Sequence, residues 1–201
     1  MSMVYQEITL IPNDDIPPYA IWSKLYNQLH IALADVANGH GINTIGVAFP
    51  DYRYSEQHDK GMLGSRLRMF APSRDELDKL DLPLRLSRLS DYVHIKAIAD
   101  VGERATGYVV VERYRHYDLG KQVERFADFK NLTVEQALEH CLAHKKKAKN
   151  YPFVRLKSET NQRQYHLHIR QYTVAKPQTG VFNTYGITNI NDETKASVPH
   201  W

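Results

Sequence analysis

The first hundred residues alternate between two hydrophobic periods in a fixed order, and this order constrains the fold most. Residues 5–10 alternate apolar and polar side chains with the period of two that is typical of a strand. From Pro17-Pro18 to about Ala37, apolar residues recur at helical spacing, and a first helical turn tolerates proline. Gly39 and Gly41 are expected to end this helix. The next predicted elements, in chain order, are a strand over 43–49, a polar connection over 51–61 and a strand over 66–70. A helical stretch then begins at a capping box at Ser73 and Glu76, breaks at Pro83 and resumes to about Leu89, and a strand over 92–98 follows.

The order strand, helix, strand, strand, helix, strand is the ferredoxin-like arrangement, which many RNA-binding sheets share. We therefore expect an α+β protein in which residues 1–104 form a ferredoxin-like (RRM-like) domain. Residues 105–201 are predicted to form a second α+β domain, with a basic helix and antiparallel strands. Its predicted elements are a strand over 108–111, a helix over 121–129, a helix from a capping box at Thr133 and Gln136 to lysines 145–147, and strands over 153–157 and 165–171.

Charge separates the two halves of the chain. The formal net charge of the whole chain is +3, but residues 1–104 hold 11 Lys and Arg against 14 Asp and Glu, whereas residues 105–201 hold 15 against 9. The second half also interleaves tyrosines with its cations, which is typical of nucleic-acid binding. We therefore expect an anionic partner there, with nucleic acid as the first candidate. A solvated basic surface without a partner is the alternative.

Several classes of protein are disfavoured by what the sequence lacks. Cys141 is the single cysteine, so an internal disulfide is excluded and a reducing cytoplasm is expected. No apolar run approaches about 18 residues and no leader pattern is present, so we expect no membrane partner. The pairs His140/His144 and His166/His168 have spacings that suit zinc, but neither has a nearby set of further ligands. Solvated histidines are the favoured interpretation, and we expect neither a metal nor another cofactor.

His30 is the most informative titratable residue. It follows Trp22 and Tyr26 at intervals of four, so the three side chains share a helix face beside the apolar stripe. The simpler interpretation is a histidine at the edge of the core that a backbone carbonyl satisfies. The alternative is that His30 takes part in the cleavage of RNA, which carries its own nucleophile, the 2′-hydroxyl beside each phosphate. A nuclease then needs a proton acceptor or donor near neutral pH, and groups that hold the reacting oxygens.

Several short segments match one known family in order and in spacing. They are Ile16-Pro17-Pro18, Leu29-His30, residues 45–51, residues 63–68, Pro152-Phe153-Val154, Leu156-Lys157-Ser158, Ile169-Arg170, Tyr185-Gly186 and residues 198–201. On these segments the chain resembles the CRISPR RNA-processing endoribonucleases of subtype I-F, nearly from end to end. The resemblance implies that His30 transfers a proton, that Ser158 holds the 2′-hydroxyl and that Tyr185 orients the imidazole.

The resemblance also implies where RNA binds. A linker that contacts the foot of the RNA stem maps onto Arg113 and Arg115, where the family has an arginine and a glutamine. The helix that enters the groove maps onto residues 121–130, which hold fewer cations than family members carry there; either it grips RNA less tightly or lysines 145–147 and 149 share the task. The expected RNA-binding residues are Arg113, Arg115, Lys121, Arg125, Lys130, Lys157, Thr160, Asn161 and Tyr165.

The expected function is that of a metal-independent endoribonuclease. It cleaves precursor CRISPR RNA at the 3′ foot of the repeat hairpin and leaves a 2′,3′-cyclic phosphate and a 5′-hydroxyl. The resemblance further implies that the protein keeps the product hairpin and joins other protein subunits of a type I-F interference complex. A non-catalytic scaffold that binds RNA hairpins is the alternative, and a metal-dependent nuclease that uses the histidine pairs is a third hypothesis.

Overall fold

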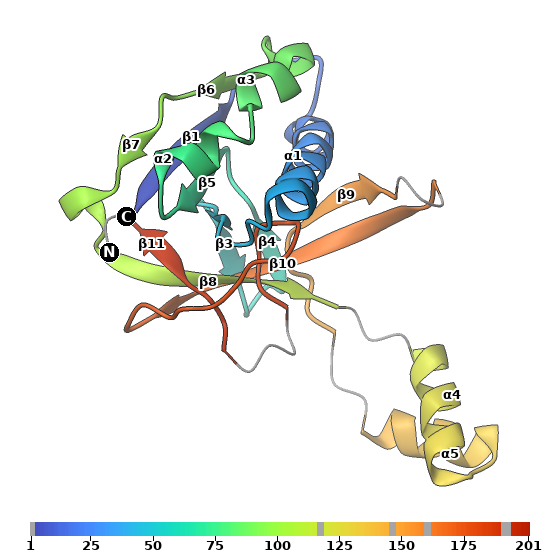
Figure 1. The fold of residues 1–201 in the computed structure, drawn as a ribbon. Helices are drawn as coiled ribbons and strands as arrows, with labels where there is room; N and C mark the ends of the chain where they lie inside the picture. Colours follow the sequence, from blue (N-terminus) through green and yellow to red (C-terminus); the bar gives the residue numbers. More distant parts are fainter. Residues whose placement is uncertain (1–2, 116–118, 145–147, 159–161, 190–193) are drawn as a thin grey trace. The chain divides into compact units, whose positions relative to one another are not determined.

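The chain forms two compact units (Figure 1). The structure, a computed structural model, describes residues 3–115, 119–144, 148–158, 162–189 and 194–201. The first unit combines Met1–Tyr114 with Tyr151–Trp201, and the second is Arg115–Asn150. The predicted boundary between two domains after residue 104 is placed where the charge of the sequence changes, not where compact units meet. This domain boundary stays a prediction.

The first sheet has the predicted ferredoxin-like order. Its strands are β1 (Val4–Leu10), β2 (Gly46–Ala48), β5 (Arg66–Ala71) and β6 (Val93–Ile95), with β7 (Ala99–Asp100) also paired to β1. They run in the order β2-β5-β1-β6, and every neighbouring pair is antiparallel. The prediction of an α+β fold is thus confirmed.

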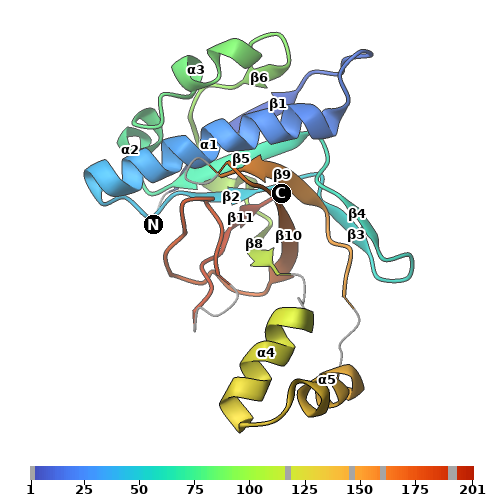
Figure 2. The same ribbon diagram turned by 90° about the vertical axis from the view of Figure 1, so that its right-hand side faces the viewer.

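Helix α1 (Pro18–His40) begins where the sequence predicts, and it continues about one turn beyond Ala37 to end at Gly41, the second of the two predicted glycines. Pro18 occupies the first turn, and Gly41 ends the helix with φ of 66°, donating its N–H to the Ala37 carbonyl at 3.0 Å. The second predicted helical stretch is divided into α2 (Arg74–Asp78), α3 (Leu82–Arg85) and the 3₁₀ turn η1 (Ser87–Leu89). The predicted break at Pro83 is wrong, because Pro83 lies in the first turn of α3, where proline is tolerated, and the break comes before it. Figure 2 shows α1 running along the sheet, with α2 and α3 on the same side.

The capping box predicted at Ser73 is only half formed. The Ser73 hydroxyl accepts the Glu76 N–H at 3.4 Å, but the Glu76 carboxylate accepts the hydroxyl of Thr44 and not the Ser73 N–H. The connection predicted over 51–61 is also wrong, because β3 (Arg53–Ser55) and β4 (Lys60–Met62) form an antiparallel hairpin there. The hairpin packs closely against a distant segment, because a Cβ on Gly61 would lie 2.7 Å from the Pro152 ring.

The second sheet belongs to the same unit. Its strands are β8 (Gly107–Tyr114), β9 (Phe153–Lys157), β10 (Gln164–Val174) and β11 (Val198–His200), in the antiparallel order β11-β8-β10-β9. Buried side chains of these strands, among them Val109, Leu156 and Leu167, join one core with those of α1 and the first sheet. Strand β9 packs against α1, which brings residues far apart in the sequence side by side.

A buried ion-pair cluster fixes the C-terminal residues on the first sheet. Arg68 Nε donates to the Glu7 carboxylate at 2.7 Å, and the guanidinium carbon lies 3.8 Å from the Trp201 ring centroid. Burial raises the pKa of the Glu7 carboxyl, but hydrogen bonds from Lys96 and Arg68 outweigh it and leave the pKa below its ordinary value.

The second unit consists of α4 (Leu119–Lys130) and α5 (Val134–Ala143). The capping box at Thr133 and Gln136 is confirmed, with both reciprocal hydrogen bonds present at 3.2 and 3.1 Å. The buried residues that hold the two helices together are Val123, Ala127, Ala137 and Cys141. The predicted lysines 145–147 lie outside the described residues. No helix in the described chain is long and apolar enough to span a membrane.

Candidate active site

His30 lies half-buried on α1, one turn after Tyr26. The prediction that Trp22 and Tyr26 lie beside the apolar stripe is wrong, because both side chains are buried within the core, and of the three only His30 is partly exposed. Its Nδ1 is 2.8 Å from the backbone carbonyl of Thr184. A carbonyl can only accept, so Nδ1 carries the proton in the neutral ring and Nε2 is then the basic nitrogen. The imidazole also stacks on Tyr185, with ring centroids 4.1 Å apart and planes 9° from parallel. The structure therefore contains a backbone carbonyl that satisfies His30, as the simpler interpretation of this residue expects. The same contact also gives the ring a defined tautomer and orientation.

The turn that carries Tyr185 is held at both ends. The Tyr26 hydroxyl donates to the Tyr185 carbonyl at 2.9 Å, and the Tyr185 N–H donates to the Asn183 side chain at 2.9 Å. Gly186 has φ of 70°, and its carbonyl accepts the Val47 N–H at 2.8 Å. A Cβ on Gly186 would lie 2.7 Å from Val47. Glycine is therefore required here both by conformation and by close packing.

Two phenols are joined beside the imidazole. The hydroxyls of Tyr165 and Tyr185 are 2.7 Å apart, and the Arg113 guanidinium carbon lies 5.9 Å from the Tyr165 ring centroid. Burial, together with the hydrogen bond to Tyr185, raises the pKa of Tyr165, and burial also raises the pKa of Tyr26. Tyr165 and Tyr26 therefore stay protonated at neutral pH and act as hydrogen-bonding groups rather than as bases.

Ser158 follows β9 at a closed turn. Its N–H donates to the Arg163 carbonyl at 2.9 Å, and its own carbonyl accepts the Gln162 N–H at 2.8 Å. The Asn27 side chain of α1 lies 3.4 Å from the Lys157 N–H, which ties the end of β9 to the helix that carries His30. Thr160 and Asn161, which the sequence predicts to contact RNA, lie outside the described residues.

A cleft of about 690 Å³ joins these side chains. The predicted site residues that line it are His30, Arg113, Lys157, Ser158, Tyr165 and Tyr185. The lining residues that the sequence analysis missed are Asn27, Ile31, Ala34, Asp35, Arg163 and Gln164. Asn27 lies three residues before His30 and Ala34 four residues after it, so helical spacing in the sequence already placed these two beside His30.

The remaining predicted RNA-binding residues belong to the second unit. Arg115 begins it, and Lys121, Arg125 and Lys130 are exposed on α4. Lys121 and Arg125 are four residues apart and so share a helix face. The Lys130 ammonium lies 5.0 Å from the Phe129 ring centroid.

Neither histidine pair belongs to a larger ligand set in the part of the chain that the structure describes. His140 stacks on Phe126 and on His144 at centroid distances of 4.5 and 4.2 Å, and the rings of His166 and His168 are 6.0 Å apart. Within the described residues, no group of three or more His, Cys, Asp or Glu is placed to hold a metal ion. The cleft presents an imidazole, hydroxyls and cations, which are groups suited to proton transfer and to binding a phosphate, and the carboxylate of Asp35 in its lining is paired with Arg85 at 2.6 Å.

This chain is similar to known proteins over most of its length. Residues 5–201 match the family model described as "CRISPR-associated protein (Cas_Csy4)". Two curated relatives named "CRISPR-associated endonuclease Cas6/Csy4", from Escherichia coli (strain UTI89 / UPEC) and Pseudomonas aeruginosa (strain UCBPP-PA14), are each 30% identical over 186 residues. Each alignment covers 92% of this chain and 94% of the relative. A solved "CRISPR associated protein Cas6" is a distant likeness, with 8% identity, 100% and 99% of the two chains covered and a TM-score of 0.36.

Proposed function

Because this chain belongs to the CRISPR-associated Csy4 family, we propose that it is an endoribonuclease that processes CRISPR RNA. Its substrate is the precursor transcript, which it cuts at the 3′ foot of each repeat hairpin. The observation that carries this proposal is that His30, Ser158 and Tyr185, from three distant segments, line one cleft. A protein that only binds RNA has no need of an oriented imidazole beside a hydroxyl.

The reaction uses the RNA's own 2′-hydroxyl. Its oxygen forms a bond to the adjacent phosphorus while the bond from phosphorus to the 5′-oxygen breaks, so the products are a 2′,3′-cyclic phosphate and a 5′-hydroxyl. The 2′-hydroxyl loses a proton and the 5′-oxygen gains one, and His30 serves this proton transfer through Nε2. Ser158 holds the 2′-oxygen, and the stacked Tyr185 ring with the Thr184 carbonyl keeps the imidazole in place.

Cations complete the site. Arg113, Lys157 and Arg163 line the cleft and stabilise the negative charge that builds up on the phosphorane. Tyr165 packs on the RNA at the cut end, and Arg115 with Lys121, Arg125 and Lys130 of the second unit contacts the hairpin stem. Other subunits of a type I-F interference complex then bind the protein with its product. A cytoplasmic location fits the single cysteine, Cys141, which is buried and unpaired.

Two paired reactions test this proposal. Repeat RNA is incubated with the protein in EDTA, and then an RNA with a 2′-deoxy nucleotide before the cut is used under the same conditions. We expect cutting of the first RNA and none of the second. Binding without cutting of either RNA would instead support the non-catalytic scaffold, and cutting that EDTA abolishes would support a metal-dependent nuclease.

A further inference from the structure

The outward face of the β9–β10 hairpin carries a row of side chains, of which only Lys157 has a role in the proposed function. Side chains directly opposite in an antiparallel pair point to the same face. The pairs are Lys157 with Gln164, Arg155 with His166, and Phe153 with His168, and we call these six residues the β9–β10 strip. The intervening residues of β9, Val154 and Leu156, are buried, so the strip is the solvent-facing side.

One end of the strip is a cluster of rings. Phe153 is 44% exposed, although its burial in the core would be favourable. Its ring centroid lies 4.3 Å from that of His166 and 5.1 Å from that of His168. His168 is held in turn, with Nδ1 3.2 Å from the Tyr151 carbonyl. An exposed aromatic ring beside two imidazoles offers a surface on which a flat base can stack.

The middle of the strip is positively charged. Arg155 and Lys157 are exposed, and residues 153–158 and 162–170 contain no Asp or Glu. Among the described residues, no carboxylate forms an ion pair with Arg155 or Lys157. Aromatic rings interleaved with unpaired cations favour a single nucleic-acid strand over an apolar or a cationic partner.

The other end of the strip opens into the cleft. Lys157 and Gln164 line the cleft together with Ser158 and His30. Four residues separate Lys157 from Phe153, so the strip extends about 13 Å from the cleft at the rise of a strand. A strand of RNA that leaves the cleft therefore meets cations first and the ring cluster next.

We propose that the β9–β10 strip binds the unpaired RNA that continues 3′ from the scissile phosphate. Phosphates of this flank contact Arg155 and Lys157, and a base stacks on Phe153 beside His166. The inference rests on the proposed function, because that function places the scissile phosphate next to Ser158. It adds that the enzyme recognises the strand it releases as well as the hairpin it keeps.

The test compares two RNAs on the full-length protein. Both carry the repeat hairpin with a 2′-deoxy nucleotide before the cut; one ends at the cut, and the other continues with a 3′ flank of uridines. We expect wild-type protein to bind the flanked RNA about tenfold more tightly, which is the scale of one stacked base. Phe153→Ala and, separately, His166→Ala should abolish this advantage and leave the affinity for the RNA without a flank unchanged.

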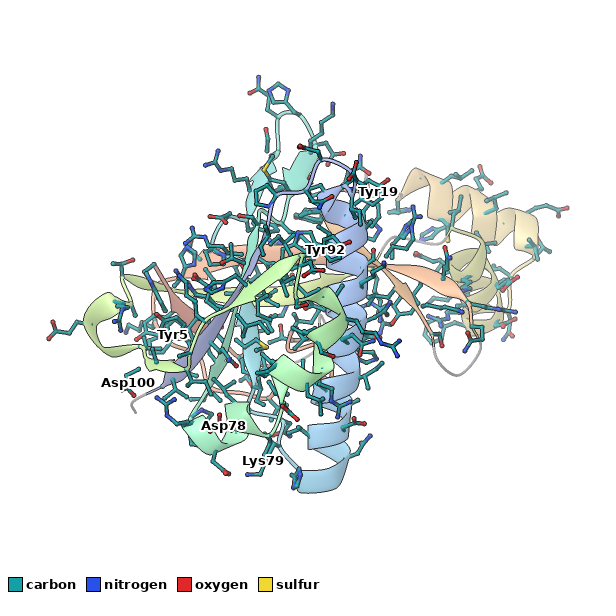
Figure 3. The ribbon with its side chains drawn as sticks, turned by 90° about the horizontal axis from the view of Figure 1, so that it is seen from above. Tyr5, Tyr19, Asp78, Lys79, Tyr92 and Asp100 are labelled. Atoms are coloured by element: carbon teal, nitrogen blue, oxygen red, sulfur yellow. The ribbon has the colours of Figure 1, made fainter. Side chains whose placement is uncertain are left out.

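Tyr19→Ala provides a matched control. Tyr19 is an aromatic residue that is 68% exposed in the first turn of α1 (Figure 3), and it belongs to neither the cleft nor the strip. Its replacement should keep the tenfold advantage. Arg155→Ala should reduce the slope of log affinity against log salt by about 0.7 for the flanked RNA alone.

The outcomes separate the two proposals. Equal wild-type affinity for the two RNAs, or a tighter binding of the flanked RNA that survives Phe153→Ala, would overturn the role of the strip. The proposed function would still stand in that case, provided that the hairpin is cut in EDTA. An equal loss of affinity for both RNAs in Phe153→Ala would also overturn it, because the ring would then contact the hairpin. The unflanked RNA serves as the folding control for every variant.

Discussion

The two compact units differ in how firmly their functional side chains are held. In the first unit, α1 is anchored by Leu25, Tyr26 and Leu29, which have no exposed surface, and His30 follows directly on this helix. In the second unit, four small or medium side chains form the core, and the cations of α4 are exposed. Proton transfer needs reacting atoms placed to a fraction of an ångström, whereas attraction to phosphates acts over longer distances. The comparison teaches that the residue proposed to transfer the proton stands on the larger core, whereas most of the cations proposed to contact the RNA stem do not.

The largest expected effect separates chemistry from binding. His30→Ala should reduce the single-turnover cleavage rate by about 10² to 10⁴-fold, which is the contribution of a positioned acid or base. Hairpin affinity should stay within about twofold of wild type, because the cations of the second unit are unchanged. His40→Ala, an exposed histidine at the end of the same helix, is the control and should cut normally. Cutting by His30→Ala at the wild-type rate would refute the assignment.

The difference in cores can be measured directly. Leu29→Ala should lower the free energy of unfolding of the first unit by about 2 to 5 kcal/mol, because it leaves a cavity. Val123→Ala should cost the second unit about 1.5 kcal/mol. Both tryptophans, Trp22 and Trp201, lie in the first unit, so their fluorescence reports that unit alone, while circular dichroism reports both. If Val123→Ala shifted the tryptophan transition as much as Leu29→Ala, the two units would not be independent.

Removing cations from α4 should weaken binding without slowing the chemistry. The double variant Arg125→Ala, Lys130→Ala should bind the hairpin about tenfold more weakly, and the salt slope should fall by up to about 0.9 for each phosphate that the protein no longer neutralises. Single-turnover cleavage at saturating RNA should be unchanged. Arg88→Ala, an exposed cation of the first unit, is the control for net charge. A slower saturated rate in the double variant would show that α4 also orders the active site.

A smaller effect is expected from Tyr185→Phe. The variant keeps the ring that stacks on His30 and loses the hydroxyl that bonds Tyr165. The loss of one neutral hydrogen bond is worth about 1 kcal/mol, so cleavage should slow about fivefold. Tyr185→Ala, which also removes the stacking, should slow it further. Equal rates for the two variants would show that the hydroxyl, and not the ring, positions the imidazole.

The smallest effect concerns pH and the packing of the C-terminus. Nδ1 of His200 is buried without a hydrogen-bond partner among the described residues, and burial, with the charge of Arg68, lowers the pKa of His200 below 6.5. As pH falls, His200 therefore binds a proton in the unfolded chain before it does so in the folded chain. The stability of the first unit should consequently fall as pH falls below 6.5. The loss should be a fraction of 1.4 kcal/mol, because His200 is partly exposed.

Urea unfolding of wild type and His200→Gln between pH 7.5 and 5.5 measures this contribution. The pKa values of the Glu7 and Asp51 carboxyls are also lowered, but the folding stability that these carboxyls contribute is lost only as pH falls below their ordinary pKa values of 4.5 and 3.8. The chosen window therefore excludes them. His200→Gln should flatten the decline, and an unchanged slope would assign it to another group.

Local patterns explain which parts of the fold were predictable. Proline in the first turn, glycine after the last and the Thr133 capping box each depend on neighbours within a few residues, and all three are confirmed. The β3–β4 hairpin was missed because its residues lack apolar alternation and are held by contacts with Pro152 and Tyr151. The Ser73 capping box is half formed because Glu76 bonds Thr44 from another segment.

Apart from the β3–β4 hairpin and the division of the second helical stretch, the sequence by itself determined the order of the elements of the first sheet and the helix that carries His30, because periodicity and capping act over short distances. Only the tertiary structure decided that Tyr185 stacks on His30, that the Thr184 carbonyl defines the tautomer, and that Arg163 and Gln164 reach the same cleft. These contacts join segments that are distant along the chain, and they exist only after the sheets and α1 have packed into one core.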